Sequence, residues 1–406
     1  MRLWSSAAPI LLSLASPWLA GSALAADDEP QAFASCIAGL SDRARNEGIS
    51  ERTLAATLAT AQYRQRIIDA DRRQPEFTDS FARYLGLRIT DTQVERGRAL
   101  AETHGPLLAR VSREHGVPAE ILLALWAVET SFGRFFGDIP TFDALATLAC
   151  DRRRSTFFAG ELMAALQLVE RGHVAPEDML GSWAGAMGHV QFMPSVYLRH
   201  AVDGDGDGRA DLWNSVPDAL TSAANFLAAL GWRPGWRWGR EVRLPADFDY
   251  TLAGRGQRRP LAEWQRFGIR NAAGGPLPVA DTTASLLVPS GHQGPAFLVY
   301  DNFHVLMRWN RSEFFALTVG ILADRIAGAP PLVTAPPADA LRLSRVQVTA
   351  MQQALNDAGF DAGSPDGIMG PATRGAIREF QHARGQIADG FPDAAVLEAL
   401  GVEASP

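Results

Sequence analysis

The chain has 406 residues, of which 47% are hydrophobic and 20% are charged, a balance typical of globular proteins with more than one domain. All 38 basic residues are arginine, which excludes a P-loop lysine and a lysine Schiff base. The net charge of −7 and the lack of a dense basic block argue against nucleic-acid binding.

Residues 1–25 have the organisation of a secretory signal. Arg2 supplies the early charge, an apolar stretch runs from Ala7 to Ala20, and residues 23–25 offer a small-residue cleavage site. The stretch is too short, and too interrupted by proline, for a secure membrane span. We therefore expect an exported, periplasmic protein without stable membrane insertion, whose mature chain starts near Ala26.

The chain has two cysteines, Cys36 and Cys150. Cys36 lies well beyond the apolar run and behind three acidic residues, which argues against a lipoprotein. In an oxidising compartment the two cysteines could form a disulfide, and closing so long a loop would add on the order of 4 kcal/mol. The sequence alone does not show that they meet.

From residue 26 to about residue 327 the chain reads mostly as amphipathic helices separated by glycine and proline turns. The clearest predicted helices are 52–59, 92–104, 118–130, 157–171, 217–230 and 311–327. Between Arg240 and Val288, prolines, glycines and short β-like runs predict a small sheet-containing insertion.

The predicted helix at 118–130 carries a glutamate on its apolar face. Glu129 follows Leu125 by four positions and Trp126 by three. A carboxyl held against a large aromatic ring in a dry pocket tends to keep its proton, so Glu129 is a candidate general acid. A structural glutamate that pairs with an arginine or fills a polar gap explains this segment equally well.

The segment from Ser182 to Ser195 interleaves small, polar and aromatic residues. Gly185 and Gly188 allow a ligand or another backbone to come close. Ser182 and Gln191 offer uncharged groups of the kind that bind sugar hydroxyls and amides. Taken alone, the pattern favours an ordinary tight turn with a packed core, and a sugar-binding site is the alternative.

Residues 203–211 have the spacing of a calcium-binding loop. The expected ligands are Asp203, Asp205, Asp207, the backbone carbonyl of Arg209, and Asp218. Asp218 or a water molecule must complete the ligand set, because Asn214 replaces the usual glutamate at position twelve of the loop. Converging carboxylates repel one another without a cation, so we expect a structural Ca²⁺. The alternative is an acidic surface turn.

Residues 328–340 are a proline-rich linker that we expect to be extended. Residues 341–403 predict a compact three-helix module with one small core. Ser344 caps the first helix, which ends at Gly359, Pro371 starts the second, and the third runs from about Pro392 to Leu400.

Taken in order, these motifs resemble the lytic murein transglycosylase B family (glycoside hydrolase family 103) across nearly all of residues 31–327. The motifs are Ala-Leu-Trp-Ala-Val-Glu129-Thr with Phe132-Gly133, Asp151-Arg-Arg-Arg154, Ser182-Trp-Ala-Gly-Ala-Met-Gly188, Gln191-Phe-Met-Pro194, the aspartate–glycine loop, Asp211-Leu-Trp213 and Arg308-Trp-Asn310. The tail resembles the small peptidoglycan-binding domain often fused to wall enzymes, through Asp366-Gly-Ile-Met-Gly-Pro-Ala-Thr373 and Ile377-Arg-Glu-Phe-Gln381.

The resemblance implies a mainly α fold. A lysozyme-like helical catalytic domain with a small sheet-containing insertion would occupy residues 26–327. The signal would precede it at 1–25, and the linker at 328–340 would join it to the three-helix peptidoglycan-binding module at 341–403.

The resemblance also implies cleavage, during cell-wall remodelling, of the β-1,4 bond between N-acetylmuramic acid and N-acetylglucosamine without water, which leaves 1,6-anhydromuramoyl ends. Glu129 matches the family's catalytic residue, as acid and then base, and no catalytic cofactor is needed. The expected partner is the peptidoglycan glycan strand. The family's substrate-binding positions fall on Tyr84, Arg153, Arg154, Phe157, Ser182, Gln191, Phe226, Trp309, Asn310 and Phe315.

Positions 157, 226, 309 and 315 often hold tyrosine in the family, so a ring is kept here and a hydroxyl is lost. Phe157 and Phe315 are of a kind found more often in the protein core than in contact with a ligand. Two rival functions stay open at this point. A muramidase of the same fold would leave reducing ends, which are one water heavier. A non-catalytic wall-binding scaffold would be insensitive to replacement of Glu129 by glutamine.

Overall fold

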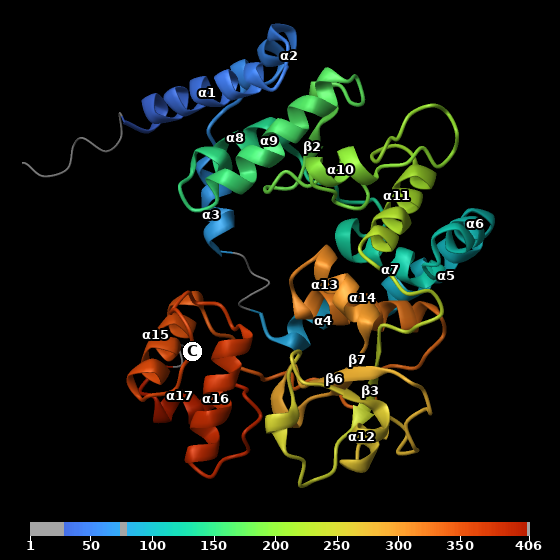
Figure 1. Ribbon diagram of the computed structural model, residues 1–406, viewed down its shortest axis with the longest axis vertical. Coiled ribbons are helices and arrows are strands. Elements are labelled where there is room, and N and C mark those ends of the chain that lie inside the picture. Colours follow the sequence, from blue (N-terminus) through green and yellow to red (C-terminus); the bar gives the residue numbers. More distant parts are fainter. Residues whose placement is uncertain (1–27, 74–78, 404–406) are drawn as a thin grey trace, which may run out of the picture.

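The structure is a computed structural model that describes residues 28–73 and 79–403. The predicted signal at 1–25 lies outside the described residues. Within the described ranges the chain forms a large helical body, a small sheet subdomain and a C-terminal helical module, each with its own hydrophobic core. Figure 1 shows the sheet below the helical body, with the C-terminal module beside it. The prediction of a mainly α protein is confirmed.

The helical body is built from helices that begin behind well-placed caps. Ser50, Ser80, Thr90, Ser215 and Ser312 each accept a hydrogen bond from a backbone N–H three residues on. The helices of the body before the sheet are α1 (Asp28–Asn46), α2 (Glu51–Ala56), η1 (Leu58–Thr60), α3 (Gln65–Arg73), α4 (Phe81–Arg88), α5 (Asp91–Thr103), α6 (Gly105–His115), α7 (Ala119–Thr130), α8 (Thr141–Cys150), α9 (Ser155–Glu170), η3 (Pro176–Asp178), α10 (Pro194–His200) and α11 (Val216–Ala229).

Two further helices, α13 (Asp301–Trp309) and α14 (Glu313–Ile326), return to the body after the sheet. The six predicted helices all exist, with ends within three residues of their predicted positions. A two-stranded ribbon, β1 (Ile139–Pro140) with β2 (Leu180–Gly181), holds the loop after Gly181 next to the start of α8.

The described part of the sheet subdomain is antiparallel, with strand order β4-β6-β7-β3-β5. Its elements are β3 (Gly239–Arg243), η4 (Tyr250–Leu252), β4 (Arg258–Pro260), α12 (Leu261–Arg266), β5 (Arg270–Asn271), β6 (Thr283–Leu287), η5 (Gly291–Gln293) and β7 (Ala296–Val299). The predicted end of the insertion at Val288 was wrong. Strand β7 lies in the middle of the sheet, buried at every position, and its pairing with β3 and β6 makes it part of this unit.

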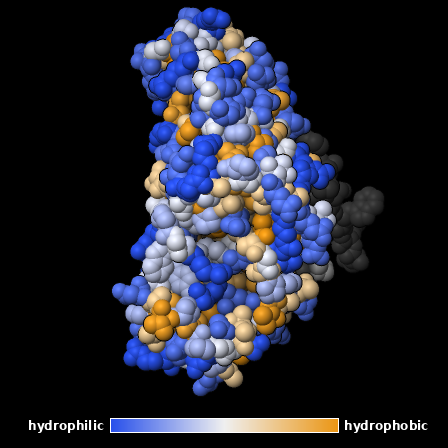
Figure 2. Space-filling model, turned by 90° about the vertical axis from the view of Figure 1, so that its right-hand side faces the viewer, coloured by the Kyte–Doolittle hydropathy of each residue, from blue (hydrophilic) through white to orange (hydrophobic). Residues whose placement is uncertain are grey.

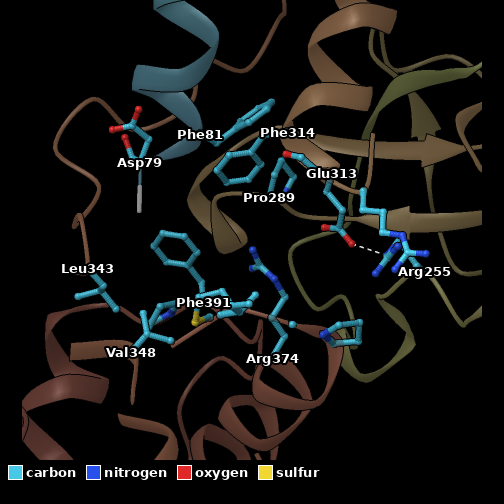
Figure 3. Close-up of a pocket in the computed structure, with 18 of the residues that line it drawn as sticks. Asp79, Phe81, Arg255, Pro289, Glu313, Phe314, Leu343, Val348, Arg374 and Phe391 are labelled. Atoms are coloured by element: carbon cyan, nitrogen blue, oxygen red, sulfur yellow. Dashed lines mark ion pairs between the residues drawn. The ribbon is translucent and has the colours of Figure 1, made fainter. Parts of the chain in front are cut away.

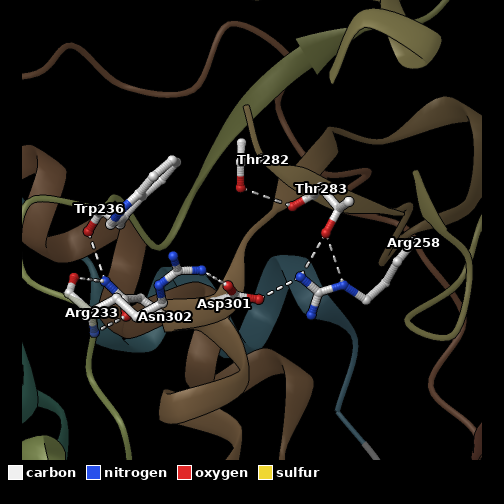
Figure 4. Close-up of polar contacts among 7 residues, drawn as sticks. All are labelled: Arg233, Trp236, Arg258, Thr282, Thr283, Asp301 and Asn302. Carbon is white, nitrogen blue, oxygen red and sulfur yellow. Dashed lines mark hydrogen bonds and ion pairs between the residues drawn. The ribbon is translucent and has the colours of Figure 1, made fainter. Parts of the chain in front are cut away.

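A polar network fastens the sheet to the helical body (Figure 4). Asp301, at the start of α13, forms ion pairs with Arg233, which follows α11, and with Arg258 of β4. Asn302 accepts from the backbone N–H of Arg233 and donates to the carbonyl of Trp236. Burial alone would raise the pKa of Asp301, but the hydrogen bonds from Arg258 and Arg233 outweigh it, so the pKa is lowered. The carboxylate therefore stays charged and holds both segments.

The structure joins Cys36 of α1 to Cys150 of α8 in a disulfide, with Cα atoms 5.9 Å apart. The bond closes a separation of 114 residues and ties the first described helix to the body. The expected pairing is thus present.

The C-terminal module consists of α15 (Arg345–Asp357), α16 (Pro371–Ala383) and α17 (Ala394–Ala399) around a core that includes Met351 and Phe380. The linker before it is held against the sheet, because the backbone N–H groups of Val333 and Thr334 donate to the Glu241 carboxylate. His292 of the sheet subdomain and Asp389 of the module form a further 2.7 Å contact.

The described helices include none with both the length and the apolar character required to cross a bilayer. The face in Figure 2 is mostly hydrophilic, carries its apolar residues in small groups, and is hollowed at mid-height.

Candidate active site

Glu129 lies in the last turn of α7, a helix whose residues from Ile121 to Ala127 are all buried. The helix packs against α14 and α5, which fixes its direction in the body. Glu129 is half-buried, and its Oε1 accepts a 2.8 Å hydrogen bond from the indole N–H of Trp309, at the end of α13. The large aromatic ring beside the carboxyl is therefore Trp309, which stands 180 residues away in the sequence.

Burial raises the pKa of the Glu129 carboxyl to about 7. The hydrogen bond from Trp309 and the nearby charge of Arg88 lower the pKa, but by less than burial raises it. Among the described residues, Arg88 is the charged side chain that acts on this carboxyl, and no second carboxylate does. The environment thus holds Glu129 ready to give up a proton near neutral pH.

The end of α7 is bent tightly back on itself and fastened to the loop that follows Ser182. Ser131, Phe132 and Gly133 all have positive φ, from 51° to 77°. A side chain at Gly133 would come within 2.3 Å of the His189 ring, so glycine is required there. Thr130 Oγ1 donates to the His189 carbonyl at 2.7 Å. This turn holds Glu129 in place relative to the loop.

Trp126 is buried and supports the loop that carries His189. Its indole N–H donates to His189 Nδ1 at 2.9 Å. Burial lowers the pKa of His189 to about 4, so the ring is neutral and able to accept this bond.

Aromatic rings form the wall beside Glu129. The ring of Trp309 lies 5.2 Å from that of Phe226 and 5.5 Å from that of Phe192. Phe226 in turn stacks against His200 at 4.8 Å. These rings pack Trp309 in place beside the carboxyl, whose burial raises its pKa.

The loop from Ser182 to Pro194 lies against the segment that follows α7, where Gly137 approaches the Ser182 backbone and Gln191 bonds Phe136. Gln191 has a positive φ of 49° and donates through Nε2 to the carbonyls of Phe136 and Gly188. Its backbone is strained, and such strain is concentrated at functional sites. Other parts of the protein come close to Gly185 and Gly188, as expected for these glycines. The Leu145 side chain lies against Gly185, and the Leu212 backbone lies against Gly188.

The other predicted sugar contacts divide into two groups. Phe157 is 46% exposed and Asn310 is exposed, so both are accessible to a ligand. Tyr84 and Phe315 are each only 3% exposed, and the guanidinium of Arg88 lies 3.7 Å above the Tyr84 ring. Both side chains lie in the interior of the protein in this conformation, and direct sugar contacts of Tyr84 and Phe315 stay a prediction.

Arg153 and Arg154 lie in the turn between α8 and α9, where both pair with the buried carboxylate of Asp71 in α3. Arg153 Nη2 also donates to the Asp71 carbonyl at 3.2 Å. These arginines therefore join two helices. Arg88 is the residue near the carboxyl that the sequence did not reveal, since it belongs to a short helix distant in the chain and matches no motif.

The acidic loop has the ligand chemistry for a cation. One oxygen from each of Asp203, Asp205 and Asp218 lies within 4.8 Å of the others, about twice a Ca²⁺–oxygen bond length. Asp218 is fully buried at the start of α11 and accepts hydrogen bonds from Gly204 and Asp211. Asp207 is not part of this group, and its Oδ1 accepts from the Arg209 N–H instead.

Comparison with known proteins gives a consistent assignment. The family model of the transglycosylase SLT domain matches residues 32–324, and that of a putative peptidoglycan-binding domain matches residues 344–400. The structure of SltB3 from Pseudomonas aeruginosa in complex with NAG-NAM-pentapeptide is 43% identical, with a TM-score of 0.88, and the match covers 91% of this chain and all of that chain.

Two Escherichia coli proteins are also similar. Membrane-bound lytic murein transglycosylase B of strain K12 is 34% identical over 264 residues, which cover 61% of this chain and 68% of that protein. The lytic transglycosylase Slt35, solved in complex with calcium, is 30% identical with a TM-score of 0.64, and the match covers 72% of this chain and 92% of that one. The chain therefore belongs to the lytic murein transglycosylase B family, as its motifs predicted.

Proposed function

We infer that this protein is a peptidoglycan lytic transglycosylase that cleaves the β-1,4 bond between N-acetylmuramic acid and N-acetylglucosamine, with Glu129 as its catalytic residue. The observation that carries the assignment of Glu129 is its carboxyl, which is desolvated, hydrogen-bonded to Trp309 and raised in pKa to about 7. Such a group is protonated often enough to act as an acid, and its carboxylate is basic enough to recover the proton.

In the first half of the reaction, Glu129 donates its proton to the glycosidic oxygen as the bond to the anomeric carbon breaks. The Trp309 N–H steadies the carboxylate that is left, because a donor bonded to the charged form stabilises it. The positive charge of Arg88 also stabilises this carboxylate.

In the second half, the Glu129 carboxylate removes the proton from the muramoyl 6-hydroxyl, whose oxygen attacks the anomeric carbon and closes the 1,6-anhydro ring. The first proton leaves on the released N-acetylglucosamine hydroxyl, the 6-hydroxyl proton restores the acid form of Glu129, and water takes no part. Most hydrolytic glycosidases use two carboxylates. The described surroundings of Glu129 supply an arginine and an indole instead, which supports the non-hydrolytic route.

Ser182, Gln191 and Asn310 suit the hydrogen-bonding groups of the glycan, and the exposed ring of Phe157 suits stacking on a sugar. The matches to residues 32–324 and 344–400 support a catalytic domain at 26–327 and a wall-binding module at 341–403, joined by the linker at 328–340. Tethering of this kind raises the effective concentration of the enzyme at an insoluble substrate. The signal pattern at 1–25 supports export to the periplasm, where that substrate lies.

We also propose that Asp203, Asp205 and Asp218 hold a structural Ca²⁺, with Asp207 and the Arg209 carbonyl as further candidates. The convergence of carboxylate oxygens supports this role, and a bound cation would cancel their mutual repulsion. The loop joins α10 to α11, so the ion would stabilise the body and take no part in the chemistry.

The test is product analysis by mass spectrometry of purified murein digested by the wild type and by Glu129→Gln. We expect anhydro products, one water lighter than reducing ends, and a loss of at least about 10²-fold for the variant. Glu120→Gln, on the first turn of the same helix, is the matched control and should retain full activity. Reducing ends alone would establish a muramidase, and unchanged activity of Glu129→Gln would remove this residue from the mechanism.

A further inference from the structure

A pocket of about 610 Å³ lies between the helical body and the C-terminal module (Figure 3). The body contributes Phe81 of α4 and Phe314 of α14, and the module contributes Val348, Phe391 and Arg374. In Figure 3 Arg374 extends from the module toward Pro289 of the sheet subdomain and Phe314 of the body. The volume lies in the range of small-molecule and peptide sites. The proposed function has no role for this pocket.

The pocket carries an excess of positive charge. Its carboxylates are already paired, Asp79 with Arg83 and Arg342, and Glu313 with Arg255. Arg374 and Arg311 form no ion pair with any residue that the structure describes, although both line the pocket. Arg374 belongs to the first turn of α16, which has no side-chain cap, so the positive end of that helix dipole also faces the pocket. An anionic group is the natural occupant.

The rest of the lining distinguishes a peptide from a sugar. The walls are aromatic and aliphatic, and the uncharged polar side chains among the lining residues are Ser80, Ser312 and His304. A saccharide needs many hydroxyl partners, which this pocket lacks. A short chain of small apolar residues with free carboxylates matches both the walls and the unpaired guanidiniums.

The pocket is within peptide reach of Glu129. Helix α4 runs from Phe81, which lines the pocket, to Arg88, whose charge acts on Glu129, and its eight residues span roughly 10–12 Å. On the other side, Arg308 and Arg311 line the pocket and flank Trp309, which bonds Glu129. An extended peptide covers about 3.3 Å per residue, so three or four residues span the length of this helix.

We propose that this pocket binds the stem peptide of the muramoyl residue held at Glu129, and that Arg374 pairs with a carboxylate of that peptide. The inference rests on the proposed function, since it assumes a murein strand in the cleft. It makes the C-terminal module part of substrate recognition and gives the enzyme a preference for strands that still carry peptides.

The experiment compares two substrates, murein glycan strands with intact stem peptides and the same strands after an amidase has removed the peptides. For full-length Arg374→Gln we expect kcat/KM on intact strands to fall about tenfold, with no change on stripped strands. Arg384→Gln, at the exposed end of the same helix, is the matched control and should change neither value. Arg374→Lys keeps the charge and should retain part of the preference.

A thermal melt of each variant establishes that the fold is intact. For the wild type, amidation of the peptide carboxylates should abolish the advantage of intact strands. Equal losses for Arg374→Gln on both substrates, or no loss on either, would overturn the peptide site. If the wild type formed no anhydro product from either substrate, the proposed function itself would fail, which is a separate result.

Discussion

Two regions of this protein hold carboxyl groups in opposite ways. Glu129 is withdrawn among aromatic rings with a single indole donor, and burial raises its pKa to about 7. Asp203 sits in a surface loop, where hydrogen bonds from the N–H groups of Gly208 and Gly206 lower its pKa. The side chains share the same functional group, so the difference comes entirely from the surroundings.

The comparison shows how one kind of group is directed to two tasks. A carboxyl that titrates near neutral pH can both give and take a proton, which is what acid–base catalysis requires. A carboxylate that stays charged at every physiological pH, close to others of its kind, is suited to a hard cation. The direction of the pKa shift therefore separates Glu129, the proposed catalytic residue, from Asp203, a proposed metal ligand.

The largest expected effect that tests this contrast is the pH dependence of turnover. The acid form of Glu129 is the productive one, and its pKa is raised, so kcat should be level below about pH 7 and fall tenfold per unit above it. At pH 9 the loss relative to the low-pH plateau should reach about 100-fold. Initial rates of anhydro-product formation across this range provide the measurement, with circular dichroism at pH 9 as the control for folding. A flat profile would contradict the assignment.

The same pKa predicts a stability difference. A raised pKa means that the folded state binds the proton more tightly than the unfolded state does, so wild-type stability should decline as the pH rises from about 4.5 to about 7. For the wild type this decline in the free energy of unfolding amounts to as much as about 3 kcal/mol. Glu129→Gln has no titrating carboxyl at this position, so its free energy of unfolding should not show the decline. Urea unfolding of both proteins at pH 5 and pH 8 gives the comparison. Parallel changes in the two proteins would show that the carboxyl is not desolvated.

The metal at the acidic loop should affect the melting temperature of the protein and have little effect on the reaction. A chelator should lower the melting temperature by about 5 °C, and added calcium should restore it. Asp218→Asn should abolish the response, because this buried carboxylate anchors the group of three. Asp207→Asn is the informative control, since Asp207 lies outside that group and its loss should matter less. A melting temperature indifferent to both chelator and calcium would refute the metal site.

Local patterns in the sequence predicted the local parts of this structure. Period and capping located the six helices, and the spacing around Leu125 and Trp126 put Glu129 on the inner side of its helix. The aspartate spacing likewise identified the acidic loop. These features depend on residues a few positions apart, where helical and turn geometry leave few choices.

Such local patterns could not predict the contacts between segments that are distant in the sequence. Tyr84 and Phe315 match family positions yet lie in the interior, because exposure depends on how α4 and α14 pack against the body. The partners of Glu129, Trp309 and Arg88, come from helices far from α7 in sequence. Central strand β7 was missed because its four apolar residues show no alternation in a fully buried strand.

The smallest expected effect concerns the hydrogen bond from the Trp309 indole to Glu129. This contact most distinguishes the surroundings of Glu129 from those of Asp203. Trp309→Phe keeps a ring against Phe226 and removes the N–H that stabilises the carboxylate. The pKa of Glu129 should then rise, so the falling limb of the pH–rate profile should move to higher pH, with a loss in kcat at pH 6 of roughly 2–10-fold. Trp213→Phe removes an indole N–H that bonds the Leu180 carbonyl and should leave the profile unchanged. A limb that stayed in place, or moved to lower pH, would mean that Trp309 acts on the substrate alone and that burial by itself sets the protonation of Glu129.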